Sequence, residues 1–173
     1  MLDKLVREAV AAIHAAFPDA PPPSPAEMHG DHCPECIATN AVFAGRRWQE
    51  ITVADLARNL PVSLLTPAAF RYYLPALMLR SVEAPGLLDC VPEGVVGSLS
   101  PPNGKPSEDM AAVYATFDEA QIRAIVAFLR VFEAREKLDG YPPEAFEWAP
   151  VSRSLARAID YWSGRMRAGG EAR

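Results

Sequence analysis

The sequence predicts an all-α fold, or a mainly α fold with a minor β element, built as a single-domain bundle of five to six helices. Six segments carry apolar residues at the three- and four-residue spacing of one helix face. Several of these segments begin with a residue that caps helices, and only one short stretch has the pattern of a strand. A chain of 173 residues has the usual length of one domain, so we expect one helical domain over residues 1–173.

The first expected helix covers residues 3–17, where Asp3 can cap the first turn. Its apolar face is formed by Leu2, Val6, Ala9, Val10, Ile13 and Phe17. Five prolines within residues 18–25 then prevent helix formation and favour a stiff, extended chain. This connector, which we place at residues 18–32, leads into a segment rich in histidine and cysteine.

The second expected helix starts at Cys33 and ends at Gly45. Pro34 suits the first helical position, which makes Cys33 the cap of this helix. The pair Arg46-Arg47 could grip an anion, but a solvated pair beside a core tryptophan, Trp48, is the simpler interpretation. Thr52 and Asp55 have the spacing of a capping box and predict a short helix to about Leu60.

The fourth expected helix opens at Thr66, with Pro67 at its first position. Its buried stripe is predicted to contain Phe70, Tyr73, Leu74, Leu77, Met78 and Val82. Pro75 lies inside this helix. Because proline lacks a backbone N–H and clashes with the preceding turn, we expect a kink there.

Residues 85–115 are expected to be irregular, with 95–99 as a short strand or an extended segment and Cys90 as a small buried residue. The fifth helix has the clearest start signal, because Asp118 can cap it and Gln121 completes the capping box. The last helix is predicted from Val151 to Ser163, with Gly164 as its stop. Residues 165–173 are then expected to be a disordered tail.

Composition narrows the possible functions. Half of the residues are hydrophobic and 23% are charged, which is typical of a soluble globular protein. The net charge of −5 provides no basic footprint for nucleic acid, and no apolar run approaches the roughly 20 residues of a membrane span. Three cysteines form no disulfide framework, so we expect a reducing, cytoplasmic environment.

The segment from His29 to Cys36, His-Gly-Asp-His-Cys-Pro-Glu-Cys, holds the only close cysteine pair and two of the three histidines. Thiolate sulfur and imidazole nitrogen are ligands that zinc selects, and Cys-x-x-Cys is the spacing of half a zinc site. We therefore expect a zinc site. Its predicted ligands are Cys33, Cys36, His32 and His29, with His14, Cys90, Asp31 and Glu35 as alternatives for the second half.

Two other interpretations of the cysteine pair stay open. In a redox site, the helix start would favour the thiolate of Cys33, and Cys36 would resolve the intermediate. The sequence around the pair lacks the βαβ pattern of a thioredoxin-like site. In the simplest interpretation, Cys36 packs inward, Pro34 starts the helix, and the histidines are exposed loop residues.

Three stretches of the chain resemble an uncharacterised family of small bacterial proteins. These are His32-Cys-Pro-Glu-Cys36, Leu65-Thr-Pro-Ala-Ala-Phe-Arg-Tyr-Tyr-Leu-Pro75, and the helix from Gln121 to Leu129. The resemblance extends over nearly the whole chain, and the string Phe-Arg-Tyr-Tyr-Leu-Pro is its most specific part. It implies no activity, because the family is of unknown function.

These observations lead to three hypotheses. The first is a binding or interaction module with a zinc site at the Cys33–Cys36 segment and a protein as its partner. The second is a thiol- or metal-dependent enzyme centred on the same two cysteines, which for hydrolysis would need an open metal position. The third is a metal-free partner protein, of the immunity or antitoxin type. No catalytic residue is assigned from the sequence.

Overall fold

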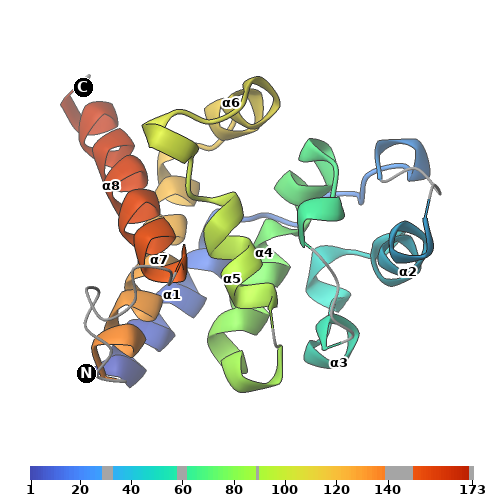
Figure 1. Ribbon diagram of the computed structural model, residues 1–173, viewed down its shortest axis with the longest axis horizontal. Coiled ribbons are helices and arrows are strands. Elements are labelled where there is room, and N and C mark those ends of the chain that lie inside the picture. Colours follow the sequence, from blue (N-terminus) through green and yellow to red (C-terminus); the bar gives the residue numbers. More distant parts are fainter. Residues whose placement is uncertain (29–32, 58–61, 89, 139–149, 172–173) are drawn as a thin grey trace. The chain divides into compact units, whose positions relative to one another are not determined.

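The computed structural model describes residues 1–28, 33–57, 62–88, 90–138 and 150–171 (Figure 1). These residues form eight α-helices and several short 3-10 turns, and no strand occurs among them. The all-α prediction is therefore confirmed. The helices are α1 (Leu2–Ala16), α2 (Pro34–Phe43), α3 (Val53–Leu56), α4 (Pro67–Glu83), α5 (Val91–Ser98), α6 (Glu108–Ala115), α7 (Glu119–Leu138) and α8 (Pro150–Glu171).

The helices divide into two compact units. One unit combines Met1–Ala16 with Leu99–Arg173, and the other is Phe17–Ser98. The first unit thus holds α1, α6, α7 and α8, and the second holds α2 to α5. The expectation of a single domain over residues 1–173 stays a prediction.

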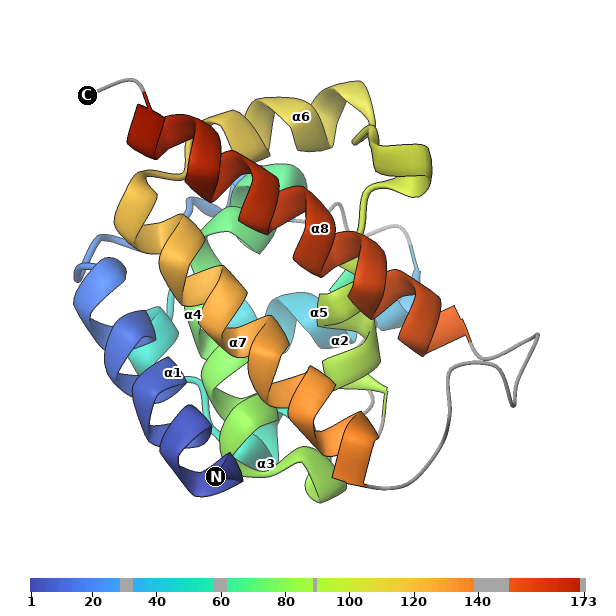
Figure 2. The ribbon, with the colours of Figure 1, turned by 90° about the vertical axis from the view of Figure 1, so that its left-hand side faces the viewer.

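In the first unit, α7 packs against both α1 and α8 (Figure 2). The helix begins as predicted, because the Asp118 carboxylate accepts from the N–H of Gln121 at 2.8 Å and the Gln121 side chain accepts from the N–H of Asp118 at 3.3 Å. The Gln121 amide also donates to the carbonyl of Ala16, at the end of α1. The apolar face of α7 is buried through Ile125, Phe128 and Leu129.

The prediction for the C-terminal helix is wrong at its end. Gly164 does not stop α8, which continues to Glu171, so residues 165–171 are not a disordered tail. The guanidinium of Arg165 donates to the carbonyl of Tyr114 at 2.7 Å and lies over the ring of Trp162. These contacts hold the turn after Gly164, where glycine costs a helix about 1 kcal/mol relative to alanine.

In the second unit, α4 forms the core. Thr66 caps it as predicted, because its hydroxyl accepts from the N–H of Ala69 at 3.1 Å. The predicted stripe of Phe70, Tyr73, Leu74, Leu77, Met78 and Val82 is buried. The helix continues through Pro75, and the kink expected there stays a prediction. Helix α5 packs on α4, and so does the 3-10 turn Trp48–Glu50.

Of the described residues in 85–115, two stretches are helical, whereas 99–107 is irregular, as expected, apart from the 3-10 turn Pro102–Gly104. The short strand or extended segment expected at 95–99 is wrong. Helix α5 covers most of that strand, and α6 follows. Val91 and Val95 lie one helical turn apart, and both are buried, so packing decides the structure against the strand preference of valine. Cys90 is exposed rather than buried, because Leu88 and Val91 take the inward positions around it.

Among the described residues, no helix combines the length and apolar character needed to cross a membrane.

Candidate functional site

Helix α2 begins with the cysteine pair. Cys33 has extended backbone angles (φ −150°, ψ 161°), and Pro34 occupies the first helical position. The Sγ of Cys33 accepts a hydrogen bond from the N–H of Cys36 at 3.2 Å. Cys33 therefore caps the helix with sulfur in the position where serine or aspartate usually places oxygen. The predicted helix start is confirmed, and Gly45 after its end has the left-handed φ of 73° expected for a stop.

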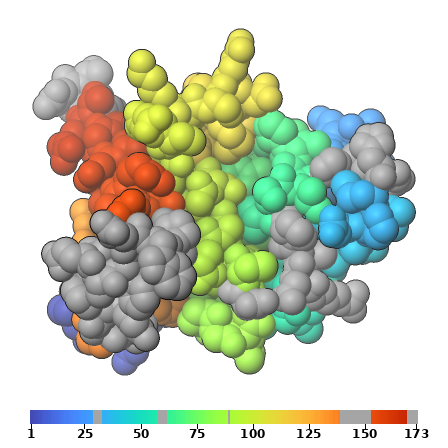
Figure 3. All heavy atoms as spheres, viewed as in Figure 1, coloured from blue at the N-terminus to red at the C-terminus, as the bar shows by residue number. Residues whose placement is uncertain are grey.

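The two sulfur atoms of the pair are neighbours. They lie 2.7 Å apart, and the structure records both residues as thiols outside any disulfide. The Cys33 side chain is partly exposed, whereas Cys36 keeps only 3% of its surface accessible. The two side chains therefore point to the same side of the backbone. Figure 3 shows the atoms of α2 at the surface on the face turned to the viewer.

The remaining predicted ligands are not placed. His29 and His32 lie outside the described residues, as does Asp31. Of the alternatives, His14 belongs to α1 in the other unit, and Glu35 lies beside the pair with its carboxylate 3.9 Å from the Sγ of Cys33. Within the described part of the chain, no three His, Cys, Asp or Glu residues gather closely enough to hold a metal ion. The zinc site stays a prediction that rests on Cys33 and Cys36.

The proline-rich connector is fixed to the second unit before it reaches the pair. The Trp48 ring N–H donates to the carbonyl of Pro18 at 3.5 Å, and Arg47 forms an ion pair with Asp19. The Tyr72 hydroxyl donates to the carbonyl of Ala20 at 2.7 Å. Sequence reasoning missed these contacts, since they join residues far apart in the chain.

The connector is also anchored at its far end. The Thr66 hydroxyl donates to the carbonyl of Glu27, and the side chain of Met28 is 2% exposed. Ser24 and Glu27 close a 3-10 turn just before this point. The chain is therefore held on both sides of residues 29–32, by Met28 on one side and by the cap of α2 on the other.

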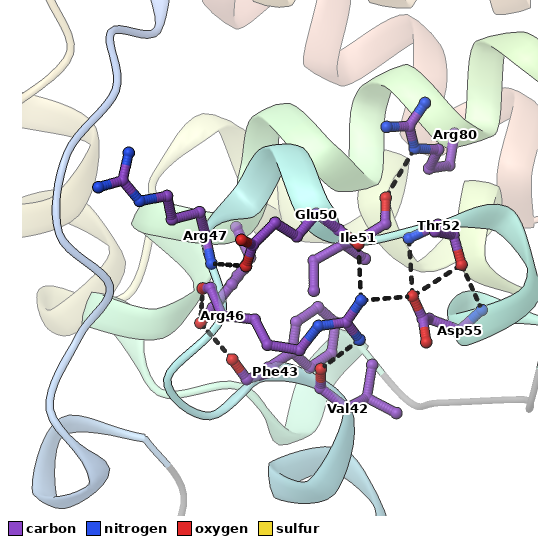
Figure 4. A network of polar contacts seen from close by, with 10 residues as sticks. Val42, Phe43, Arg46, Arg47, Glu50, Ile51, Thr52, Asp55 and Arg80 are labelled. Carbon is purple, nitrogen blue, oxygen red and sulfur yellow. Dashed lines mark hydrogen bonds and ion pairs between the residues drawn. The ribbon is translucent and has the colours of Figure 1, made fainter.

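A polar network holds the other end of α2 (Figure 4). The guanidinium of Arg46 donates to the carbonyl of Val42 at 3.1 Å and to that of Glu50 at 2.6 Å, and it forms an ion pair with Asp55. The prediction of a solvated Arg46 is wrong, because these acceptors draw the side chain into the structure. For Arg47, which is about half exposed, and for the buried Trp48 the prediction is correct.

The network changes the ionisation of two side chains. The Arg46 guanidinium beside Asp55 holds the pKa of that carboxyl well below its usual range. Burial raises the pKa of the Tyr73 hydroxyl, which donates to the carbonyls of Phe43 and Arg46 at 2.5 and 2.9 Å. Both groups serve to fix the end of α2 against α3 and α4, and neither lies at the cysteine pair.

Comparison with known proteins gives one match. The model of a family of unknown function, DUF6714, matches residues 26–166. No curated protein and no solved structure is detectably similar to the chain. The matched region begins just before the cysteine pair, covers α2 to α7 and most of α8, and spans more than half of the chain. The protein therefore belongs to this family of unknown function.

Proposed function

We propose that the protein is a binding module in which Cys33 and Cys36 hold a zinc ion. The observation that carries the proposal is the placement of two sulfur atoms side by side at the start of α2, 2.7 Å apart. Thiolates one helical turn apart form one half of many structural zinc sites. The partial exposure of Cys33 gives an ion access to the pair from solvent.

The proposed second half of the site is His32 and His29. His32 directly precedes Cys33 in the sequence and so is the first candidate for the third ligand. His29 is separated from it by Gly30 and Asp31, and glycine permits the tight turn that would bring the imidazole back. Two thiolates and two imidazoles complete the tetrahedral set that zinc prefers.

The fixed ends of this segment give the ion a structural role. Met28 is buried and Cys33 caps α2, so a zinc ion held by residues on both sides would join the connector to the helix. A site with four protein ligands is closed and leaves no position for a reactive water. We therefore propose binding rather than catalysis as the function of this site.

The test is the zinc content and melting temperature of the full chain purified without chelator. We expect one zinc per chain in the unmodified protein and loss of zinc in Cys33→Ser and Cys36→Ser. His32→Ala and His29→Ala should bind zinc more weakly. Cys90→Ser is the matched control, because Cys90 is an exposed cysteine outside the pair.

The size of the expected effect follows from linkage. Free zinc at a hundred times its dissociation constant should stabilise the chain by about 2.7 kcal/mol. Because thiols and imidazoles must lose their protons to bind, the affinity should fall as the pH is lowered. A chain that contains no zinc and whose melting temperature does not respond to added zinc would overturn the proposal.

A further inference from the structure

The spacing of the two sulfur atoms points to a second chemistry at the same pair. A disulfide bond has an S–S length of about 2.05 Å, whereas two thiolates on one tetrahedral zinc at about 2.3 Å lie roughly 3.8 Å apart. The two Sγ atoms face each other at the start of α2, so both a shared metal ion and a direct S–S bond are within their reach.

We propose that Cys33 and Cys36 form a reversible dithiol–disulfide pair that exchanges with small organic disulfides. The cap geometry favours this, because the N–H of Cys36 holds the Sγ of Cys33 on the side of the backbone where Cys36 also lies. Cys33 precedes the first helical residue, so movement of its side chain disturbs only the capping bond from the N–H of Cys36.

The different exposure of the two thiols sets the order of the steps. A disulfide in solution reaches the partly exposed Cys33 first, because only 3% of the surface of Cys36 is accessible. Cys36 then lies in position to attack the sulfur of Cys33 from inside. Cys33 is thus the attacking thiol and Cys36 the resolving thiol.

The reaction is a two-step exchange. The Cys33 thiol loses its proton to solvent, and its sulfur attacks one sulfur of the disulfide RSSR, whose S–S bond breaks and releases one RS⁻. The Cys36 thiol then loses its proton and attacks the Cys33 sulfur, which forms the Cys33–Cys36 bond and releases the second RS⁻. The pair gives up two electrons, and RSSR takes them to become two RSH.

One consequence rests on the proposed function. If the pair holds zinc, the disulfide removes both thiolate ligands, and oxidation releases the ion. The exchange itself needs no metal and can be tested on the metal-free chain.

The experiment equilibrates the reduced, metal-free full chain with mixtures of reduced and oxidised glutathione. After acid quenching, the remaining thiols are alkylated and counted by intact mass. The chain has three cysteines. We expect three alkylated thiols in reducing mixtures and, in oxidising mixtures, a Cys33–Cys36 disulfide that carries no glutathione, while the exposed single thiol of Cys90 is either alkylated or carries one glutathione. Cys33 and Cys36 alkylated in every mixture, or a bond from either of them to Cys90, would overturn the proposal.

Variants test the order of attack. Cys36→Ser should stop at a glutathione adduct on Cys33, because the resolving thiol is gone. Cys33→Ser should form an adduct on Cys36 at least about tenfold more slowly, since exchange rates depend on access. Cys90→Ser should behave like the unmodified chain. Equal adduct rates in Cys33→Ser and Cys36→Ser would contradict the assignment of Cys33 as the attacking thiol.

The two proposals at this site fail separately. A chain that binds no zinc but forms the Cys33–Cys36 disulfide supports the exchange and removes the zinc module. A chain that binds zinc but keeps the Cys33 and Cys36 thiols in oxidising mixtures supports the zinc module and removes the exchange. If the chain both binds zinc and forms the Cys33–Cys36 disulfide, oxidised glutathione added to the zinc-loaded chain should release zinc to a colorimetric chelator.

Discussion

The guanidinium of Arg46 and the carboxylate of Asp55 form an ion pair, with 3.0 Å between Nη2 and Oδ2, that ties the turn after α2 to α3. The same carboxylate accepts from the N–H and the hydroxyl of Thr52, so it also closes the capping box of α3. The end of the helix that carries the cysteine pair is therefore held by a charged, partly buried contact.

Asp55→Asn should destabilise the chain by about 1–3 kcal/mol at neutral pH, because it removes a charge-assisted hydrogen bond while keeping the shape of the side chain. Urea unfolding measures the change. Glu119→Gln is the matched control, since its partner Arg123 is about half exposed and surface pairs contribute about 0–1 kcal/mol. Equal losses in the two variants would contradict the role of Asp55.

The same variant should change the acid dependence of stability. Arg46 depresses the pKa of Asp55 in the folded chain, so the unfolded chain binds more protons in acid. The contribution of Asp55 is complete above its ordinary pKa of about 3.9 and is lost as the pH falls toward the folded value. Stability curves below about pH 4 should be flatter for Asp55→Asn. Parallel curves would argue against this linkage.

Tyr73→Phe should cost about 1–3 kcal/mol, because the buried hydroxyl donates to the carbonyls of Phe43 and Arg46. Tyr72→Phe is the control, since its hydroxyl donates to the carbonyl of Ala20 at an exposed position and should cost less. Burial raises the pKa of Tyr73, so its contribution is complete below about pH 10 and is lost as the pH rises above that value. A smaller loss for Tyr73→Phe than for Tyr72→Phe would contradict this ranking.

Two glycines in α5 should respond differently to alanine. A Cβ at Gly94 would lie 3.2 Å from Cγ2 of Val62, whereas a Cβ at Gly97 meets nothing within 4 Å. Gly97→Ala should stabilise the chain by about 0.5–1 kcal/mol, because alanine favours the helix. Gly94→Ala should gain less or destabilise, since Val62 must move. Thermal unfolding of both variants gives the comparison, and equal gains would show that α5 does not approach Val62 closely.

Leu74→Ala should destabilise the chain by about 2–5 kcal/mol, because Leu74 is fully buried in the centre of α4. Leu87→Ala is the control for the same chemical change at a side chain that is 68% exposed. Denaturant unfolding should show a change within about 0.5 kcal/mol for the control. A similarly small change for Leu74→Ala would place it outside the core.

The sequence predicted the helix starts because their signals are local. Thr66, Asp118 and Cys33 each cap the helix that follows within three residues, and the structure shows each of these bonds. Pro34 at the first helical position was enough to predict that both cysteines lie at a helix start.

Features that depend on distant residues could not be predicted. Val95 and Val96 favour a strand by themselves, and only packing on α4 makes them helical. Gly164 resembles a helix stop in the sequence, but in the structure the guanidinium of Arg165 lies over the ring of Trp162 and the helix continues. The anchor of the connector, from Tyr72 to Ala20, spans 52 residues and leaves no pattern in the sequence.

The zinc module is tested most directly by the absorption spectrum of the chain with Co²⁺, which occupies tetrahedral zinc sites and reports bound thiolate by a sulfur-to-cobalt charge-transfer band. The account predicts this band in the unmodified chain and in Cys90→Ser. It predicts loss of the band in Cys33→Ser, in Cys36→Ser, and when zinc displaces cobalt. A spectrum without the charge-transfer band in the fully reduced chain would contradict the claim that Cys33 and Cys36 hold a metal ion.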